Sequence, residues 1–336
     1  MLAKQIDFLA IGDTVIDAFI RLKDAHVNCK VNTSDCELCV RFGDKIPFEY
    51  VKVVPAVGNA ANAAVAAARL GLRSAFVTNL GEDHNGHDCL ASLQRDKVVT
   101  SYVKLQKSKP TNYHFVLWYD VDRTILVKHT EFEYSLPKFP APKWIYLSSL
   151  AANTYSYHLE VAEYLEAHPG VKLAFQPGTF QMQLGFGKLK RIYDRTDLFI
   201  VNVEEAQRIL SVDETAPDAR DVKKLMKGLA AHGPKLVAMT DNTNGAYLYD
   251  GDHFYHIPMY PDPRPAFERT GCGDAWASTF VSAMAMGKTP LEALLWAPIN
   301  PMSVAQFIGA QEGLLTLEQL EWWLGRAPAD YKPREI

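Results

Sequence analysis

The chain has 336 residues, of which 48% are hydrophobic and 22% charged, and its formal net charge at pH 7 is −4. This composition is typical of a globular protein with a sizeable core, and the negative charge argues against a nucleic-acid-binding protein, which is usually basic. No apolar run approaches the roughly 20 residues of a membrane span, and residues 1–7 do not resemble a signal peptide, so we expect a cytoplasmic protein without a membrane partner.

The cysteines indicate whether the protein resides in a reducing or an oxidising compartment. There are five of them, and an odd number in a chain of this length favours reduced thiols over a disulfide scaffold. Cys29, Cys36 and Cys39 lie close together and include a C-x-x-C pair, so a zinc site is an alternative, with His26 or a distant group as the fourth ligand.

The N-terminal part of the chain predicts a buried strand followed by a helix of small residues. Residues 6–12 form a short apolar run that ends at Gly12, and Asp17 follows in an apolar context where an isolated carboxylate needs a hydroxyl or N–H partner. Residues 57–71 are rich in alanine and stop at a glycine, as a helix does. Gly58, Asn59 and Asn62 near its start are candidate binding residues, although Asn62 could equally bond to nearby backbone.

The middle of the chain changes from alternating strands to a regular succession of strands and helices. Residues 101–105, 113–119 and 123–128 alternate between apolar and polar, and with residues 50–54 they predict a small antiparallel sheet. Further on, strands at 144–149, 172–176, 197–202 and 235–240 alternate with helices near 157–167, 182–194, 203–211 and 219–231. This order predicts a mostly parallel sheet covered on both faces, with ligands at the carboxyl ends of the strands.

Polar residues stand at two of those strand ends. Asn202 and Glu205 are three residues apart at a helix start, where they can face the same way or simply cap the helix. Thr240 and Gly245 bracket a loop in which Asn242 replaces an expected glycine, and asparagine tolerates positive φ better than most residues.

Residues 268–280 read as a loop that opens a helix. Gly271 and Gly273 flank Cys272, which lets the backbone turn tightly and present its N–H groups, and the first turn of a helix leaves further N–H groups unpaired. Such a place binds anions, phosphate above all, and its positive field should let Asp274 ionise easily. The alternative is that Asp274 only caps the helix.

The last part of the chain predicts an interrupted helix. Residues 291–307 have a helical pattern that contains Pro298 and Pro301, so we expect a kink or a break there. Asn300 and Ser303 are candidates for contact with a nucleobase.

These motifs, taken together, resemble the ribokinase-like (phosphofructokinase B) family of sugar kinases. Thr270, Gly271, Gly273 and Asp274 resemble the family signature Asp-Thr-x-Gly-Ala-Gly-Asp. Further matches occur in the same order as in the family: Asp17, Gly58 with Asn62, Gly81 with Asp83, Asn202 with Glu205, and Thr240 with Gly245.

The resemblance implies the fold and the partners. It implies one ribokinase-like α/β domain over residues 1–336, a three-layer α/β/α sandwich with a mostly parallel central sheet. A small antiparallel β lid, formed by residues of about 18–55 and 100–130, would cover the acceptor and join two subunits in a homodimer.

It also implies ATP-dependent phosphorylation of a hydroxymethyl group on a small sugar or a nucleoside. Asp274 would be the general base, and the N–H groups of Gly271, Cys272 and Gly273 would form the anion hole. Asp17, Gly58, Asn59 and Asn62 would bind the acceptor, whereas Asn202, Glu205, Thr240, Gly245 and Asn300 would bind ATP, with Mg²⁺ at Glu205. K⁺ activation stays open because Glu268 and Arg269 replace the family's Asp-Thr, and Arg269 could occupy the place of the cation.

Departures from the family pattern keep a second reading open. Val57, Asn242 and Pro298 would suit a sugar- or nucleoside-sensing module of the same fold that has lost turnover. A Rossmann dehydrogenase is disfavoured because the first strand ends in Gly12-Asp13-Thr14 and lacks a G-x-G-x-x-G turn. The acceptor is open as well: Lys30, Arg41, Lys45 and Arg123 would suit a phosphorylated sugar, and Phe19, Phe42, Phe48 and Trp118 a nucleobase.

Overall fold

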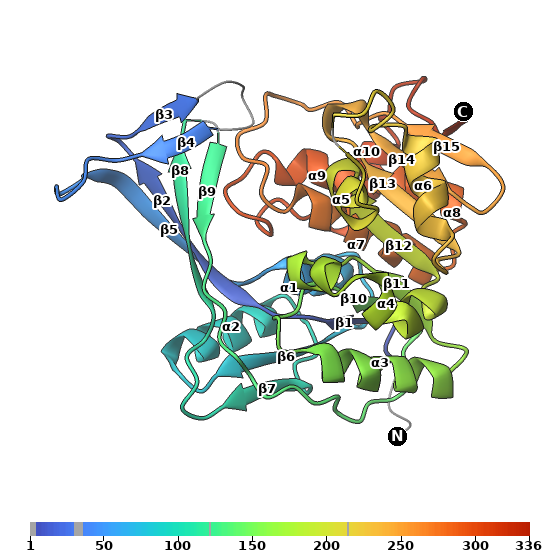
Figure 1. Ribbon diagram of the computed structural model, residues 1–336, viewed down its shortest axis with the longest axis horizontal. Coiled ribbons are helices and arrows are strands. Elements are labelled where there is room, and N and C mark those ends of the chain that lie inside the picture. The colour runs from blue at the N-terminus through green and yellow to red at the C-terminus, as the bar shows by residue number, and fades with distance from the viewer. Residues whose placement is uncertain (1–4, 30–35, 121, 214) are drawn as a thin grey trace.

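The architecture is built on a ten-stranded sheet with a smaller sheet beside it (Figure 1). The computed structural model describes residues 5–29, 36–120, 122–213 and 215–336, so Lys30 and Val121 lie outside the described residues. The large sheet has the order β16 (Arg334–Glu335), β15 (Phe254–Ile257), β14 (Ala246–Tyr249), β13 (Leu236–Thr240), β12 (Leu198–Asn202), β11 (Lys172–Phe175), β10 (Trp144–Leu147), β1 (Phe8–Ile11), β6 (Ser74–Gly81) and β7 (Val103–Gln106). Neighbouring strands from β13 to β7 run parallel to one another. The pairs β13–β14, β14–β15 and β15–β16 are antiparallel.

Helices cover both faces of this sheet, as the strand–helix rhythm predicted. Successive residues of β1 point to opposite sides: Phe8 and Ala10 enter one buried core, and Leu9 and Ile11 enter the other. The first core is closed by α1 (Asn59–Arg69), α2 (His84–Arg95), α7 (Cys272–Ala285), α8 (Pro290–Trp296), α9 (Ile299–Val304) and α10 (Leu317–Leu324). The second is closed by α3 (Tyr155–Ala167), α4 (Thr179–Arg195), α5 (Val203–Ile209) and α6 (Val222–Ala230). The fold is therefore the predicted three-layer α/β/α sandwich.

The smaller sheet stands at one side of this body, at the left of Figure 1. Its order is β5 (Phe48–Val57), β2 (Val15–Leu22), β8 (Tyr113–Tyr119) and β9 (Asp122–Leu126), and a hairpin of β3 (His26–Cys29) and β4 (Cys36–Cys39) lies beyond β2 in the chain. The pairs β2–β5 and β8–β9 are antiparallel, as expected, whereas β2 and β8 run parallel. We call these four strands the small sheet.

Two expectations about the small sheet were wrong. Residues 101–105 do not belong to it, because β7 continues the large sheet parallel to β6 after the crossover helix α2. Conversely, β2 was not expected as a strand, although it lies at the centre of the small sheet. Its first five residues are all buried, so its sequence lacks the alternation that marks a half-exposed strand.

The interrupted helix was predicted correctly. α8 ends at Trp296, and α9 starts at Ile299, with Pro298 at its N-cap. Among the described residues, no helix combines the length and the hydropathy that crossing a bilayer requires.

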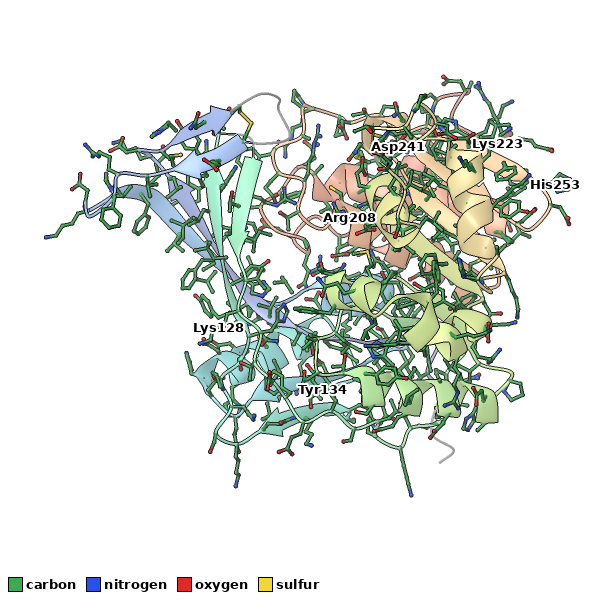
Figure 2. All side chains as sticks on the ribbon, in the orientation of Figure 1. Lys128, Tyr134, Arg208, Lys223, Asp241 and His253 are labelled. Carbon is green, nitrogen blue, oxygen red and sulfur yellow. A yellow bond between two sulfur atoms is a disulfide. The ribbon has the colours of Figure 1, made fainter. Side chains whose placement is uncertain are left out.

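The prediction of reduced thiols was wrong for two of the cysteines. Cys29 and Cys36 lie opposite each other in the β3–β4 hairpin, and their sulfur atoms form a disulfide (Figure 2). Cys39 is free, and the described residues contain no group of three or more His, Cys, Asp or Glu side chains able to hold a metal ion. The cysteines therefore give no support to a zinc site, and their number no longer indicates a reducing compartment.

Candidate active site

The start of α7 has the loop geometry that its sequence predicted. Gly271 is the N-cap residue with a φ of 82°, and a Cβ atom there would lie 2.2 Å from Cβ of Ala310, so only glycine fits. The N–H of Cys272 already donates to the carbonyl oxygen of Arg269 at 3.3 Å. Cys272 and exposed Gly273 both line a cavity in front of this turn. The N–H of Gly273 is therefore the best placed of the three expected donors.

Asp274 lies in the first turn of α7, where two side-chain amides hold its carboxylate. Asn62 Nδ2 donates to Oδ2 at 2.8 Å, and Gln176 Nε2 donates to Oδ1 at 3.5 Å. Burial raises the pKa of Asp274 to about 6, even though hydrogen bonds from Asn62, Gln176 and Asn59 lower it. The expectation that the helix N-terminus would make Asp274 ionise easily was wrong in direction, because desolvation outweighs the helix field.

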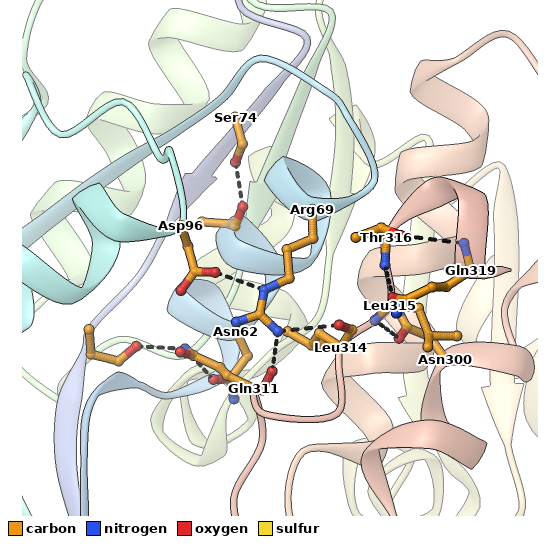
Figure 3. Close-up of polar contacts among 12 residues, drawn as sticks. Asn62, Arg69, Ser74, Asp96, Asn300, Gln311, Leu314, Leu315, Thr316 and Gln319 are labelled. Carbon is orange, nitrogen blue, oxygen red and sulfur yellow. Dashed lines mark hydrogen bonds and ion pairs between the residues drawn. The ribbon is translucent and has the colours of Figure 1, made fainter.

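Helix α1 brings the second part of the site against α7. Asn62 is 4% exposed, and Gln311 Nε2 donates to its Oδ1 at 3.0 Å (Figure 3). Its Nδ2 is left to donate to Asp274. Val57 ends β5 and pairs with Val15, and the positive φ of the turn, 104°, falls on Gly58. The departure at Val57 therefore leaves the turn before α1 intact.

A first cavity, of about 330 Å³, lies between α1, the small sheet and α4. We call it the acceptor cavity. Its lining side chains and backbone come from Asp13, Thr14, Val15, Gly58, Asn59, Asn112, His114, Val127, His129, Ser149, Thr179 and Phe180. Its volume lies in the usual range for small-molecule sites.

Two carboxylates stand on this side of the site. Asp17 is 8% exposed and lies opposite His114 in the parallel pair β2–β8, with His114 Nδ1 3.5 Å from Oδ1 of Asp17. That oxygen makes no hydrogen bond to any described residue, so its acceptor capacity is free. Asp13 accepts the hydroxyl of Tyr134 at 2.8 Å and 3.0 Å, and burial raises its pKa to about 7 (Tyr134 is labelled in Figure 2). Sequence reasoning treated Asp13 only as the end of a strand.

A second cavity, of about 460 Å³, lies in front of the start of α7. We call it the donor cavity. It is lined by Arg123, Asn202, Thr240, Asn242, Thr243, Gly245, Ala246, Met259, Tyr260, Asp262, Ala266, Arg269, Cys272, Gly273, Trp276, Pro298, Pro301, Met302 and Ala305. Three of the expected nucleotide residues, Asn202, Thr240 and Gly245, therefore meet in one cavity.

Asn202 and Glu205 also cap α5, which is the alternative that the sequence left open. The N–H of Glu205 donates to Asn202 Oδ1 at 2.7 Å, and the N–H of Asn202 donates to Glu205 Oε2 at 2.9 Å. Burial raises the pKa of Glu205, and the nearby charges of Asp274 and Glu204 raise it further. The two roles coexist, because Asn202 caps the helix and lines the donor cavity.

The loop after β13 keeps its turn in spite of the missing glycine. Asn242 adopts a φ of 46°, as expected from its tolerance of positive φ. Gly245 has a φ of 92°, and a Cβ there would lie 2.1 Å from the carbonyl oxygen of Ile257. The one glycine that the loop requires is present.

Asn300 does not lie where a nucleobase contact would need it. It is fully buried, its Nδ2 donates to Thr279 Oγ1 at 2.9 Å, and its Oδ1 accepts the N–H of Leu315 at 2.9 Å (Figure 3). It does not line the donor cavity, whereas its neighbours Pro301 and Met302 do. The expected nucleotide contact of Asn300 is therefore wrong, since its amide joins α9 to α7 and to the chain before α10.

A buried glutamate, Glu268, holds the loop before Thr270 in place through hydrogen bonds. Glu268 Oε1 accepts the backbone N–H and the hydroxyl of Thr270 at 2.7 Å and 2.5 Å. Arg123 of β9 lies beside it, with Nε 3.7 Å from Oε1, and also lines the donor cavity. Arg269 is exposed. Arg123 and Arg269 both line the donor cavity, so both set a positive charge beside this loop, and Arg123 is the one that lies next to the Glu268 carboxylate.

Asp274 lines neither cavity itself, but residues that contact or adjoin it line both. Gly58 and Asn59, at the start of α1, line the acceptor cavity, and Cys272 and Gly273, at the start of α7, line the donor cavity. The Asn62–Asp274 hydrogen bond joins these two helix starts. A carboxyl group that can accept a proton therefore stands between two sites for small molecules.

Known proteins are similar to this chain in sequence and in fold. The family described as pfkB family carbohydrate kinase matches residues 27–306. A nucleoside kinase of Methanothermobacter thermautotrophicus is 25% identical over 326 residues, which cover 94% of this chain and 93% of that protein. A ribokinase of Bacillus subtilis is 28% identical over 273 residues, covering 79% and 86%.

A solved structure supports the same fold. Arabidopsis thaliana ribokinase, complexed with ribose and ATP, superposes with a TM-score of 0.78 at 19% identity, covering 95% of this chain and 99% of the other. Because the family match spans most of the chain, the chain belongs to the pfkB family of carbohydrate kinases, phosphotransferases that act on alcohol groups.

Proposed function

We propose that this protein transfers the terminal phosphoryl group of ATP to a hydroxymethyl group of a small sugar or a nucleoside, with Asp274 as the general base. The observation that carries the proposal is that Asp274 is hydrogen-bonded to Asn59, which lines the acceptor cavity, and directly follows Gly273, which lines the donor cavity. Its pKa of about 6 suits a base that works near neutral pH, because a base is most effective when its pKa is close to the operating pH.

The proposed step needs only groups that this chain supplies and the two substrates. The hydroxyl of the acceptor loses its proton to a carboxylate oxygen of Asp274 and forms a bond to the terminal phosphorus of ATP, while the bond from that phosphorus to the bridging oxygen breaks and ADP leaves. Asn62 and Gln176 orient the carboxylate through their amides. Of the three expected N–H donors, Gly271, Cys272 and Gly273, that of Gly273 would face the charge of the transferred group, and alignment and electrostatics would supply most of the rate.

The acceptor and donor would be held by different elements. Asp17, Gly58, Asn59 and Asn62 would bind hydroxyl groups, and the unfilled acceptor capacity of Asp17 supports this role. On the donor side, the loop from Thr240 to Gly245 would hold ATP, together with the start of α5.

Mg²⁺ would be bound on this side as well. Asn202 and Glu205 offer an amide oxygen and a carboxylate, which are hard oxygen ligands of the kind this ion prefers. The ion would neutralise charge on the donor phosphates. We infer no role for K⁺, because Arg123 already sets a positive charge beside the buried carboxylate of Glu268.

The small sheet would act as the lid of the acceptor cavity and as a homodimer surface. Val53, Ala18, Phe115 and Leu126 are neighbours in register across its four strands. Val53 is 50%, Phe115 45% and Leu126 51% exposed, so they form an apolar stripe that is interrupted by Ala18, which is buried. A second copy of the stripe would cover it. Sedimentation should show a dimer for the wild type and a monomer for Phe115→Glu, and an unaltered dimer would exclude this surface.

A sensing module without turnover is the second candidate, and the observations weigh against it. The departures at Val57 and Asn242 leave both turns intact, and the base and both cavities are present. The test is ADP release by the full chain with ATP and Mg²⁺ over a panel of sugars and nucleosides. Release that depends on an acceptor supports the kinase, whereas acceptor binding by calorimetry without ADP release supports the sensor.

A further inference from the structure

The acceptor cavity combines two kinds of lining. Its lining presents hydrogen-bonding groups, among them the carboxyl of Asp13 and the amide of Asn59, which also bonds to Asp274. Its other lining residues include the rings of Phe180 and His129 together with Val127. A simple sugar needs hydroxyl-binding groups around the whole molecule. The side chains of Phe180 and Val127 do not bind hydroxyl groups, so they favour an acceptor that also carries an apolar or aromatic group.

The charges at this cavity select an uncharged acceptor. No lysine or arginine is among its lining residues in the part of the chain that the structure describes. Asp13 lines it, and Asp17 lies next to the lining residue His114. Arg41 and Lys45 are exposed on the loop between β4 and β5, and Arg123 lines the donor cavity. A phosphorylated sugar would therefore meet carboxylates and no fixed cation, which is unfavourable at short range.

Three rings form a continuous group across the boundary between the small sheet and the body. Phe180 of α4 and His129, which follows β9, meet edge to face with ring centroids 5.6 Å apart. His129 and His114 meet in the same way at 5.5 Å. Phe180 and His129 are only half-buried, so their rings are accessible from the cavity.

The two histidines also carry hydrogen-bonding capacity that the protein does not use. His114 Nε2 and His129 Nδ1 are buried and make no hydrogen bond to any described residue. Burial and the neighbouring His114 lower the pKa of His129, so its ring is neutral near pH 7. A neutral imidazole offers one donor and one acceptor, which matches the mixed donors and acceptors on the edge of a heterocyclic base.

We propose that the acceptor is a nucleoside, with its ribose hydroxyls at Asp13, Asp17 and Asn59 and its base against Phe180, His129 and His114. This inference rests on the proposed kinase function. It assigns Phe180 and His129 as specificity residues that touch the base and leave the reacting hydroxyl to Asp274. The base would stack on the accessible ring of Phe180 and lie against the rings of the two histidines.

The first test compares acceptors that share the same hydroxymethyl group. Ribose, the four common ribonucleosides, fructose and a hydroxymethylpyrimidine without a sugar are each supplied to the full chain with ATP and Mg²⁺, and ADP release is followed. We expect kcat/KM for the best ribonucleoside to exceed that for ribose by at least roughly tenfold, since stacking of one base on an aromatic ring contributes about this much or more. A higher kcat/KM for ribose, fructose or the pyrimidine would overturn the inference and leave the kinase function standing.

The second test removes the ring of Phe180 and keeps its apolar volume. Phe180→Leu should raise the KM for the best nucleoside by roughly fivefold to a hundredfold, while the KM for ribose and kcat for both change by less than about twofold. Tyr155→Leu is the matched control, because Tyr155 is an exposed aromatic residue at the start of α3, outside both cavities. Equal changes for ribose and nucleoside in Phe180→Leu would contradict a contact with the base.

A separate measurement keeps this inference distinct from the proposed function. If no acceptor gives ADP release, the kinase function fails, and calorimetry with ribose and the nucleosides then decides the inference alone. Nucleoside binding that weakens in Phe180→Leu would sustain it, and the absence of nucleoside binding would end it.

Discussion

The side-chain amide of Asn62 donates a 2.8 Å hydrogen bond to Asp274, a residue 212 positions further along the chain. This bond joins the first turns of α1 and α7, whose residues Asn59 and Gly273 line the acceptor and the donor cavity. It also lowers the pKa of Asp274, because a donor stabilises the charged carboxylate. The protonation of Asp274 therefore depends on its amide neighbours as well as on its burial.

The first prediction concerns the pH dependence of activity. Gln176 is the second amide donor to Asp274, so Gln176→Leu should raise the pKa of Asp274 above about 6. Activity requires the carboxylate form, hence kcat/KM should rise with pH through about 6 in the wild type and at a higher pH in the variant. Gln207→Leu, at a buried glutamine of α5 that bonds to the carbonyl of Ala219, is the control. An acid limb at the same pH in wild type and Gln176→Leu would show that the limb reports another group.

The second prediction concerns stability. Burial raises the pKa of Asp13 to about 7 from an ordinary value of 3.8, so the folded state holds this proton more tightly than the unfolded state. The contribution of this group to stability is present below about pH 4 and is lost as the pH rises to about 7. Asp13→Asn cannot ionise, and its free energy of unfolding should fall less than that of the wild type between pH 5 and pH 8.

Urea denaturation at these two pH values measures the effect. Other carboxylates, such as Asp83 with its lowered pKa, contribute equally to the pH dependence of both proteins. The difference in unfolding free energy between variant and wild type therefore reports Asp13 alone. Parallel pH dependences for the two proteins would rule out a protonated Asp13 in the folded state.

The third prediction concerns Arg123. Its guanidinium lies 3.7 Å from Glu268 and lines the donor cavity, so Arg123→Ala should raise the KM for ATP by roughly tenfold, as expected for one partly buried charge contact. Lys128→Ala removes an exposed cation from the segment after β9, outside both cavities, and should leave the KM unchanged (Figure 2). Steady-state kinetics at saturating acceptor separates the two variants, and an equal KM for both would remove Arg123 from the donor site.

Local motifs were readable from the sequence because their geometry is set within a few residues. The turn at Gly271, the positive φ at Asn242 and the break at Pro298 each follow from the conformational preference of one residue type. The same holds for the succession of strands and helices, which fixed the layers of the large sheet.

Site residues that come from distant strands could not be predicted from the sequence. His114 and His129 lie on or beside the small sheet and reach the acceptor cavity only because β8 pairs with β2. Gln176 directly follows β11, a place where polar residues were expected to matter, but nothing in its sequence context links it to Asp274. Pairing between strands far apart in the chain decides these contacts.

Two predictions, for Asn300 and Asp274, were wrong because each residue was assigned the role that its type often has, without knowledge of its surroundings in this fold. Asn300 has a buried amide that the packing of α9 on α7 already satisfies. Asp274 lies at a helix N-terminus, and yet its pKa is raised, because two helices and the large sheet exclude water around it. Both outcomes depend on burial, which the sequence does not determine at these positions.

The most direct test of the central claim is the turnover number of Asp274→Asn. This change keeps the size of the side chain but removes its ability to take a proton, and it leaves one oxygen in place of two to accept the bonds from Asn62 and Gln176, so kcat for acceptor-dependent ADP release should fall by roughly 10² to 10⁴. Asp252→Asn, in the exposed loop between β14 and β15, should keep wild-type kcat. A folded Asp274→Asn protein with wild-type turnover would contradict the role of Asp274 as the base.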